Sequence, residues 1–168
     1  VHRQENVDLP ERLEKVLDCL VAVRDKWKLP VLVSTHPRTR IRLEALGRQG
    51  LEGITFHEPF GYLDYNKLQM NANCVISDSG TLSEESAILG FRAVSLRVST
   101  ERPEALNQGS MMLAGLDPTS LLLALEVTGA QDLTVNKPEG YETEDFSSRV
   151  LKFVLSTARL HRSWRGIH

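Results

Sequence analysis

Apolar residues recur at helical spacing near the start of the chain. They are Leu13, Val16, Leu17, Leu20, Val21 and Trp27. This spacing predicts an amphipathic helix that ends near Trp27. Asp8, with Glu11 three residues later, matches a capping box, and Pro10 suits the first turn of a helix. We therefore expect the helix to open at Asp8.

Short apolar segments and short helical patterns alternate after this helix. The segments with strand-like composition are 30–35, 54–57, 74–77 and 93–98, and the helical patterns between them are 39–46, 62–72 and 81–89. Gly47 and Gly90 follow two of these helices, as glycine often does at a helix end. Such alternation is typical of a parallel sheet with helices on both faces. The predicted fold is an α/β domain with a doubly wound parallel sheet.

The regular alternation of apolar and polar residues ends at about Gly129. Before this point we expect a short helix at 103–107, a small strand at 111–113 and a helix at 118–127 capped by Asp117. A loop without periodicity and a last amphipathic helix at 144–160 follow, the helix with an apolar stripe of Phe146, Val150, Phe153, Val154 and Leu160. We expect one α/β domain over 1–142. Residues 143–168 should form a helix that packs on that domain or crosses to another one.

Composition and charge exclude several classes of partner. The chain has 168 residues, of which 20 are basic and 22 acidic, and its net charge is −2. Nucleic-acid binding requires a basic surface, so we expect no nucleic-acid partner. No segment reaches the roughly 20 consecutive apolar residues of a membrane span, and none has the pattern of a signal peptide. We expect a cytoplasmic protein with no membrane partner.

The two cysteines, Cys19 and Cys74, lie far apart and lack the spacing of a zinc site. Free thiols are therefore expected, with neither a disulfide nor a metal site. No motif calls for a cofactor, and we expect none. The chain begins at Val1 without a methionine, which suggests a piece of a longer protein.

A turn of small residues joins the strand predicted at 74–77 to the next helix. In doubly wound sheets, ligands bind at the carboxyl ends of the strands, where helix N-termini offer free N–H groups to anions. Gly80 would let a phosphate approach the backbone, and Ser79 and Thr81 would offer hydroxyl donors. Alternatively, these residues only cap a helix, because Thr81 and Glu84 also match a capping box.

Two charged residues near this turn are further candidates. Glu85 lies one turn into the helix, where it could accept hydrogen bonds from sugar hydroxyls or simply stabilise the first helical turn. Arg102 follows the strand predicted at 93–98. Its guanidinium could pair with a phosphate, or it could form a local ion pair with Glu101 or Glu104.

Other candidates lie at comparable positions in the predicted topology. Phe60 follows a strand, where it could stack on a nucleotide base or belong to the core. His36 also follows a strand, and its alternative place is a polar loop. His2 and Arg3 precede the first helix and could face the same cleft, although a terminal histidine is more often solvated.

The order of several short motifs along the chain is more informative than any one of them alone. They are His2-Arg3-Gln4-Glu5-Asn6, Thr35-His36-Pro37, Glu58-Pro59 with Tyr62-Leu63, Ser77-Asp78-Ser79-Gly80 with Glu84-Glu85, and Thr100-Glu101-Arg102-Pro103-Glu104-Ala105. Together they resemble the C-terminal domain of the non-hydrolysing UDP-N-acetylglucosamine 2-epimerases, and the resemblance covers nearly the whole chain. It implies the second of two Rossmann-like domains in the arrangement called GT-B, with a UDP-sugar bound in the cleft between them.

The resemblance also implies an activity and partners. The enzyme would be an isomerase that inverts C2 of a UDP-linked 2-acetamido sugar by eliminating UDP and adding it back. Its place would be bacterial cell-surface polysaccharide synthesis, as in capsule or O-antigen. The implied partners are the UDP-sugar, the missing N-terminal domain and, for the full-length enzyme, a second copy in a homodimer.

The resemblance implies roles for individual residues. His2 would be the catalytic histidine near the pyrophosphate, and Ser79 and Gly80 would form the phosphate-binding turn. Glu85 would bind the ribose hydroxyls, Arg102 would contact the ligand, and His36 would lie near a second, regulatory UDP-sugar site. Arg3, Thr81 and Phe60 join the predicted UDP-binding residues because of their positions in the predicted topology. No metal ligand is implied.

The chain departs from the family pattern in several places. Many members have two glycines after the serine, where this chain has Gly80-Thr81, and have Gln and Phe where it has Phe60 and Tyr65. The sequence of 79–86 looks more like the branch that forms UDP-N-acetyl-fucosamine precursors. A GT-B glycosyltransferase is the alternative enzyme, because it also binds its nucleotide in a C-terminal domain. A plain nucleotide-binding module is the non-catalytic alternative.

Overall fold

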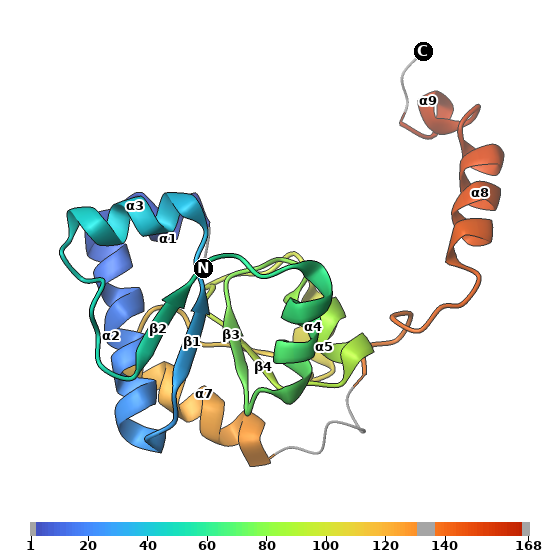
Figure 1. Cartoon of the computed structure of the whole chain (residues 1–168). Coiled ribbons are helices and arrows are strands. Elements are labelled where there is room, and N and C mark those ends of the chain that lie inside the picture. The colour runs from blue at the N-terminus through green and yellow to red at the C-terminus, as the bar shows by residue number, and fades with distance from the viewer. Residues whose placement is uncertain (1–2, 131–136, 166–168) are drawn as a thin grey trace. The chain divides into compact units, whose positions relative to one another are not determined.

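The computed structural model of the chain describes residues 3–130 and 137–165. The chain forms two compact units, Val1–Pro138 and Glu139–His168. The elements of the first unit are α1 (Gln4–Val7), α2 (Pro10–Trp27), β1 (Val31–Ser34), α3 (Pro37–Ala45), β2 (Ile54–His57), α4 (Tyr62–Asn71), β3 (Val75–Ser77), α5 (Leu82–Leu89), β4 (Ala93–Ser95), α6 (Pro103–Asn107), β5 (Met112–Leu113) and α7 (Pro118–Ala130) (Figure 1). Those of the second unit are α8 (Phe146–Thr157) and α9 (His161–Trp164).

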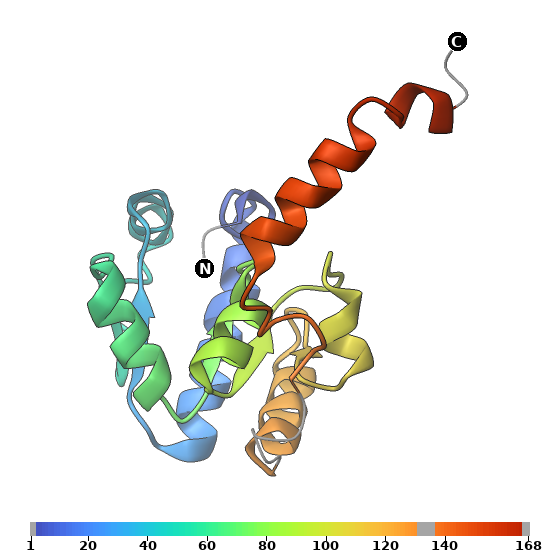
Figure 2. The ribbon, with the colours of Figure 1, turned by 90° about the vertical axis from the view of Figure 1, so that its right-hand side faces the viewer.

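The strands of the first unit are parallel wherever they pair. Among the described residues, backbone hydrogen bonds join β1 to β2, and join β3, β4 and β5 in that order. Helix α2 packs against α7, and both helices contact strands (Figures 1 and 2). The predicted parallel α/β fold is therefore confirmed, with its strands hydrogen-bonded in two groups.

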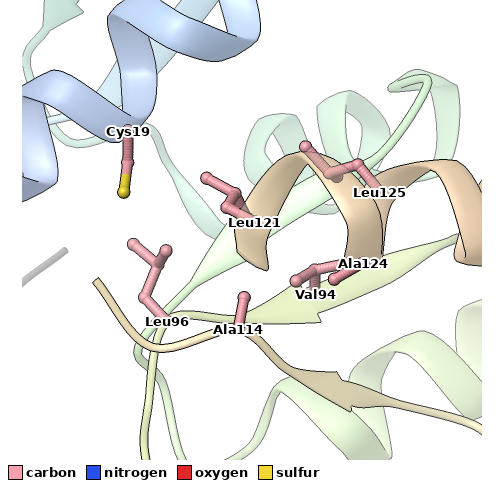
Figure 3. Close-up of a cluster of buried hydrophobic side chains, with 7 residues drawn as sticks. All are labelled: Cys19, Val94, Leu96, Ala114, Leu121, Ala124 and Leu125. Carbon is pink, nitrogen blue, oxygen red and sulfur yellow. The ribbon is translucent and has the colours of Figure 1, made fainter. Parts of the chain in front are cut away.

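The main apolar core lies where α2 and α7 meet the group of strands that contains β4. Its buried members are Cys19, Val94, Leu96, Ala114, Leu121, Ala124 and Leu125 (Figure 3). Figure 3 shows the Cys19 side chain of α2 directed toward Leu96 and Leu121. Because these side chains come from elements far apart in the sequence, their burial holds α2 and α7 to the strands.

Both cysteines are free, as predicted. Burial, with the nearby Asp117 and Asp18 carboxylates, raises the pKa of Cys19 to about 11. Burial raises the pKa of Cys74 to about 12, although a backbone hydrogen bond and Arg92 oppose that shift. Both thiols therefore stay protonated near neutral pH and act as packing groups rather than nucleophiles.

The predicted opening of the first long helix at Asp8 is wrong. Helix α2 begins at Pro10 with Leu9 as its N-cap, and no side chain caps it. Asp8 instead ends α1, and its Oδ1 accepts a hydrogen bond from Arg38 Nε at 2.9 Å. The carboxylate that would cap α2 is thus engaged by α3, and Pro10 alone marks the helix start.

Other element boundaries follow the predictions closely, with two exceptions. The strand predicted at 93–98 is shorter, because β4 ends at Ser95. The helix predicted at 118–127 extends to Ala130, and the Ser120 backbone N–H donates to Asp117 Oδ2 at 2.7 Å. This hydrogen bond makes Asp117 a cap and lowers its pKa. Gly90 ends α5 in the left-handed conformation, with φ 73°, as its sequence position predicts.

The second unit contains two helices where one was predicted over 144–160. Helix α8 ends at Thr157, and the short α9 follows. The predicted stripe is exposed within this unit, at Phe146, Val150, Phe153, Val154 and Leu160. The packing of this helix on the α/β domain or on another domain stays a prediction. In the described part of the chain, no helix has the length and apolarity that crossing a bilayer requires.

Leu121→Ala should strongly destabilise the first unit. Leu121, on α7, is fully buried in the main apolar core. Its truncation leaves a cavity and should lower the free energy of unfolding by about 2–5 kcal/mol. Leu123→Ala is the control on the same helix, because Leu123 is 59% exposed. Urea unfolding measures both variants, and equal losses would contradict the described core.

Candidate functional site

Asp78 anchors the turn between β3 and α5. The residue is fully buried, and its Oδ2 accepts hydrogen bonds from the Arg3 backbone N–H and from Asn6 Nδ2, each at 3.1 Å. Arg3 Nε donates to the Asp78 carbonyl oxygen at 3.0 Å. The Asn6 side chain is oriented from its other end by Arg12, whose Nη2 donates to Asn6 Oδ1 at 2.9 Å. The segment before α2 is therefore tied to the turn that follows β3.

The hydroxyl groups of the turn form a connected chain of hydrogen bonds. The Thr81 backbone N–H donates to Ser79 Oγ at 3.4 Å, and the Ser79 and Thr81 hydroxyl oxygens lie 3.1 Å apart. Thr81 Oγ1 donates its hydrogen to Glu85 Oε1 at 2.6 Å. Since that hydrogen is used, the Ser79 hydroxyl is the donor to Thr81. The hydrogen bonds of the turn thus reach Glu85, the second of the two adjacent glutamates on α5.

Two guanidinium groups lie next to Gly80. A Cβ atom placed on Gly80 would lie 3.7 Å from Arg3 Nη2 and 3.9 Å from Arg97 Nη1. These are ordinary contact distances, and the φ of Gly80 lies outside the left-handed region, so the folded chain alone does not require glycine here. A glycine between two cations leaves the backbone open to an anion.

Arg97 lies at the candidate site and was missed by the sequence interpretation. Its side chain is 6% exposed, and it holds Glu101 with two hydrogen bonds, Nη1 to Oε2 and Nη2 to Oε1, each 2.6 Å long. The same carboxylate lies 3.9 Å from Arg3 Nη2. The available signal was an arginine inside the apolar segment 93–98, four residues before a glutamate.

Glu84 and Arg102 form an ion pair, so the capping box predicted for Thr81 and Glu84 is wrong. The Thr81 side chain makes no cap hydrogen bond, and Glu84 accepts from Arg102 Nε and from Ser83 Oγ. Burial opposes ionisation of Glu84, but the hydrogen bonds from Arg102 and Ser83 outweigh it and lower the pKa. Arg102, expected at a phosphate or beside Glu101 or Glu104, therefore has Glu84 as a partner.

A cavity of about 240 Å³ opens beside the turn. Its lining residues are Ser34, His36, Pro59, Tyr65, Ser77, Ser79 and Glu85. Ser34 and Ser77 are the last residues of β1 and β3, so the cavity lies at the carboxyl ends of two parallel strands. Three predicted site residues, His36, Ser79 and Glu85, thus line one cavity. Burial, with Glu85 and Asp78, raises the pKa of Tyr65, which keeps its hydroxyl protonated.

Phe60 and His36 occupy defined positions at this end of the strands. The Phe60 ring stacks on His57, with ring centroids 4.2 Å apart and planes 7° from parallel. His36 is the N-cap of α3, and its Nδ1 accepts a hydrogen bond from the Arg38 backbone N–H at 3.2 Å. His2, the predicted catalytic residue, lies outside the described residues. Among the described residues, no cluster of three or more His, Cys, Asp or Glu side chains is arranged to hold a metal ion.

Arg97→Met should raise the pKa of Glu101. The hydrogen bonds from Arg97 are the largest cause that lowers this pKa to about 2, from a usual 4.5, and a backbone hydrogen bond and the Arg3 charge also lower it. Because the folded value is depressed, the pair stabilises the fold above pH 4.5 and loses this effect as the pH falls toward 2. Carboxyl-carbon NMR should show Glu101 ionised at pH 3.5 in the wild type and protonated to a clearly greater extent in the variant. Arg149→Met, which breaks the exposed pair with Asp145, is the control. An unchanged Glu101 titration in Arg97→Met would contradict the bidentate pair.

Comparisons with known proteins agree on one family. A protein-family model described as UDP-N-acetylglucosamine 2-epimerase matches residues 1–155. A UDP-N-acetylglucosamine 2-epimerase of Methanococcus maripaludis is 38% identical over 144 residues, which are 83% of this chain and 39% of that protein. A UDP-2,3-diacetamido-2,3-dideoxy-D-glucuronate 2-epimerase of Pseudomonas aeruginosa is 35% identical over 115 residues, 68% of this chain and 32% of that protein.

A solved structure has the same fold. The crystal structure of the Methanocaldococcus jannaschii UDP-GlcNAc 2-epimerase, in complex with UDP-GlcNAc and UDP, superposes with a TM-score of 0.82 at 30% identity, over 92% of this chain and 43% of that one. The chain thus spans about two fifths of the length of these two UDP-N-acetylglucosamine 2-epimerases. With the family model matching nearly its whole length, the chain belongs to the UDP-N-acetylglucosamine 2-epimerase family.

Proposed function

We propose that this chain is the UDP-binding part of an isomerase that inverts C2 of a UDP-linked 2-acetamido sugar. The observation that carries the proposal is the glycine turn between the Arg3 and Arg97 guanidinium groups, which lies beside a cavity lined by Ser79 and Glu85. Guanidinium cations beside a glycine backbone suit a diphosphate, and a carboxylate suits the ribose hydroxyls. Membership of the epimerase family supports the same assignment.

The residues divide according to the parts of the nucleotide. The diphosphate would lie at Ser79, Gly80 and Thr81, with Arg3, Arg97 and Arg102 supplying positive charge; the ribose would lie at Glu85; the base would lie near Phe60; and His36 would lie near a regulatory UDP-sugar. Arg97 is an addition to the residues proposed from the sequence.

The chemistry makes UDP a leaving group. A base removes the C2 proton, the electron pair of that C–H bond forms the C1–C2 double bond, and the C1–O bond breaks with its electrons passing to a phosphate oxygen. UDP then adds back to C1 while a proton is delivered to the other face of C2. The negative charge that grows on the diphosphate is stabilised by the guanidinium groups and the backbone N–H groups of the turn. We place His2 at the pyrophosphate as the catalytic histidine of this chain.

The rest of the enzyme would complete the site. The N-terminal domain would hold the sugar and supply further groups for proton transfer, and the exposed apolar stripe of α8 would pack on the α/β domain or on that N-terminal domain. The full-length enzyme would be a cytoplasmic homodimer that serves the synthesis of a bacterial surface polysaccharide. A GT-B glycosyltransferase is not favoured, because the relatives are named as epimerases.

Gly80→Ala should weaken UDP binding by about ten-fold without destabilising the chain. The added methyl group meets only the Arg3 and Arg97 side chains at ordinary contact distances, but it occupies the surface that the diphosphate approaches. Isothermal titration with UDP measures the affinity, and thermal unfolding checks the fold. Gly50→Ala is the matched control, because a Cβ there meets nothing within 4 Å. A folded wild-type chain that does not bind millimolar UDP, or a Gly80→Ala variant that binds like the wild type, would contradict the proposed site.

The full-length enzyme should convert its UDP-sugar without any acceptor. Incubation of UDP-N-acetylglucosamine with the enzyme should give the C2 epimer and a small amount of free UDP, because the diphosphate leaves during each turnover. NMR of the sugar protons follows both products. Turnover that requires an acceptor alcohol would instead support the glycosyltransferase.

A further inference from the structure

A buried glutamine lies behind the carboxylate that we place at the ribose. Gln69, on α4, is 3% exposed, and its Nε2 donates a hydrogen bond to Glu85 Oε2 at 3.0 Å. The other carboxylate oxygen, Oε1, accepts from Thr81 Oγ1 at 2.6 Å. Each oxygen of Glu85 is therefore held by one donor from a different part of the chain.

The Gln69 amide is not fully satisfied. Within the described residues its Oε1 is buried and has no hydrogen-bond partner. Reversal of the amide would place this oxygen against the Glu85 carboxylate, where two acceptors repel, so the donor orientation is the favoured one. A buried acceptor without a partner destabilises a fold, and a leucine or methionine would fill the same space without that cost. The advantage of an amide at this position is its hydrogen bond to Glu85, which an apolar side chain could not form.

The position of Gln69 links it to the cavity. Tyr65 lies one helical turn earlier on α4 and lines the cavity together with Glu85, whereas Gln69 is not among the lining residues. Gln69 thus contacts Glu85 from outside the cavity, and a ligand in the cavity could bind Glu85 without touching Gln69. An ionised carboxylate has about four lone-pair directions, so two internal donors leave capacity for two hydroxyl groups.

We propose that Gln69 is a positioning residue that fixes the Glu85 carboxylate for a vicinal diol, and that the chain thereby selects ribonucleotides. The inference rests on the proposed UDP site. Glu85 makes the contact with the ligand, and Gln69 acts only through Glu85, together with Thr81. Without the Gln69 donor, the Glu85 carboxylate is held at only one of its oxygens and can rotate. This rotation should weaken its contacts with the diol but not the contacts of the turn with the diphosphate.

A comparison of two nucleotides separates this role from a structural one. The 168-residue chain is titrated with UDP and with 2′,3′-dideoxy-UDP, which lacks both ribose hydroxyls, and the ratio of the two affinities is measured by NMR or calorimetry. The wild type should prefer UDP by about ten-fold or more, as expected for hydrogen bonds to a charged group. Gln69→Leu should lower this ratio several-fold by weakening UDP alone, and its affinity for 2′,3′-dideoxy-UDP should stay unchanged.

Controls keep the test decisive. Gln69→Met is the second variant if Gln69→Leu does not fold, and it should lower the ratio in the same way. Asn71→Leu, also an amide-to-apolar change on α4, should keep the wild-type ratio, because Asn71 donates to the Lys67 carbonyl and not to Glu85. A folded Gln69 variant with the wild-type ratio overturns the inference alone. A wild type that binds both nucleotides equally overturns the inference together with the assignment of Glu85 to the ribose. A wild type that binds neither nucleotide overturns the UDP site itself.

Discussion

The buried carboxylate of Asp78 is the interaction on which the candidate site depends. A fully buried carboxylate is costly unless it is hydrogen-bonded, and its donors include the Arg3 backbone and the Asn6 amide, both from the segment before α2. The requirement to satisfy Asp78 therefore brings the start of the chain to the turn after β3, across 75 positions of sequence. As a consequence Arg3 lies beside Gly80. The guanidinium group of Arg97, which follows β4, lies near the same glycine.

The guanidinium groups around the turn already have carboxylate partners within the chain. Arg97 is held by Glu101, Arg102 pairs with Glu84, and Arg3 lies 3.8 Å from Glu5 and 3.9 Å from Glu101. These carboxylates hold the guanidinium groups in place, which lowers the cost of ordering them around an anion. They also compete with the anion for the same charge. The turn is thus preorganised, and the free energy gained on binding the proposed diphosphate would be the difference between two sets of ion pairs rather than the full attraction of the cations.

Local sequence signals predicted the elements well and the side-chain partners poorly. The strand at 54–57 and the helix at 103–107 have the predicted bounds, because apolar periodicity and Pro103 are local features. The capping boxes assigned to Asp8 and Glu11 and to Thr81 and Glu84 were wrong, because each motif assumes that its acid is free. Asp8 is bound by Arg38 and Glu84 by Arg102, and both partners come from other elements. A local rule fails where a distant cation competes for the same carboxylate.

The same reasoning explains which parts of the site were visible in the sequence. Ser79, Gly80 and Glu85 could be proposed from the sequence because they adjoin a strand end, where the topology of an α/β fold places ligands. Arg97 and Gln69 were missed because each looks unremarkable in its own segment and acquires its role only from a partner, Glu101 for one and Glu85 for the other. Both are nearly buried, and a buried polar side chain must be explained by the group it bonds. Candidate ligand-binding residues can thus be proposed from their position along the chain, whereas the residues that hold them in place are recognised only once the buried hydrogen bonds are known.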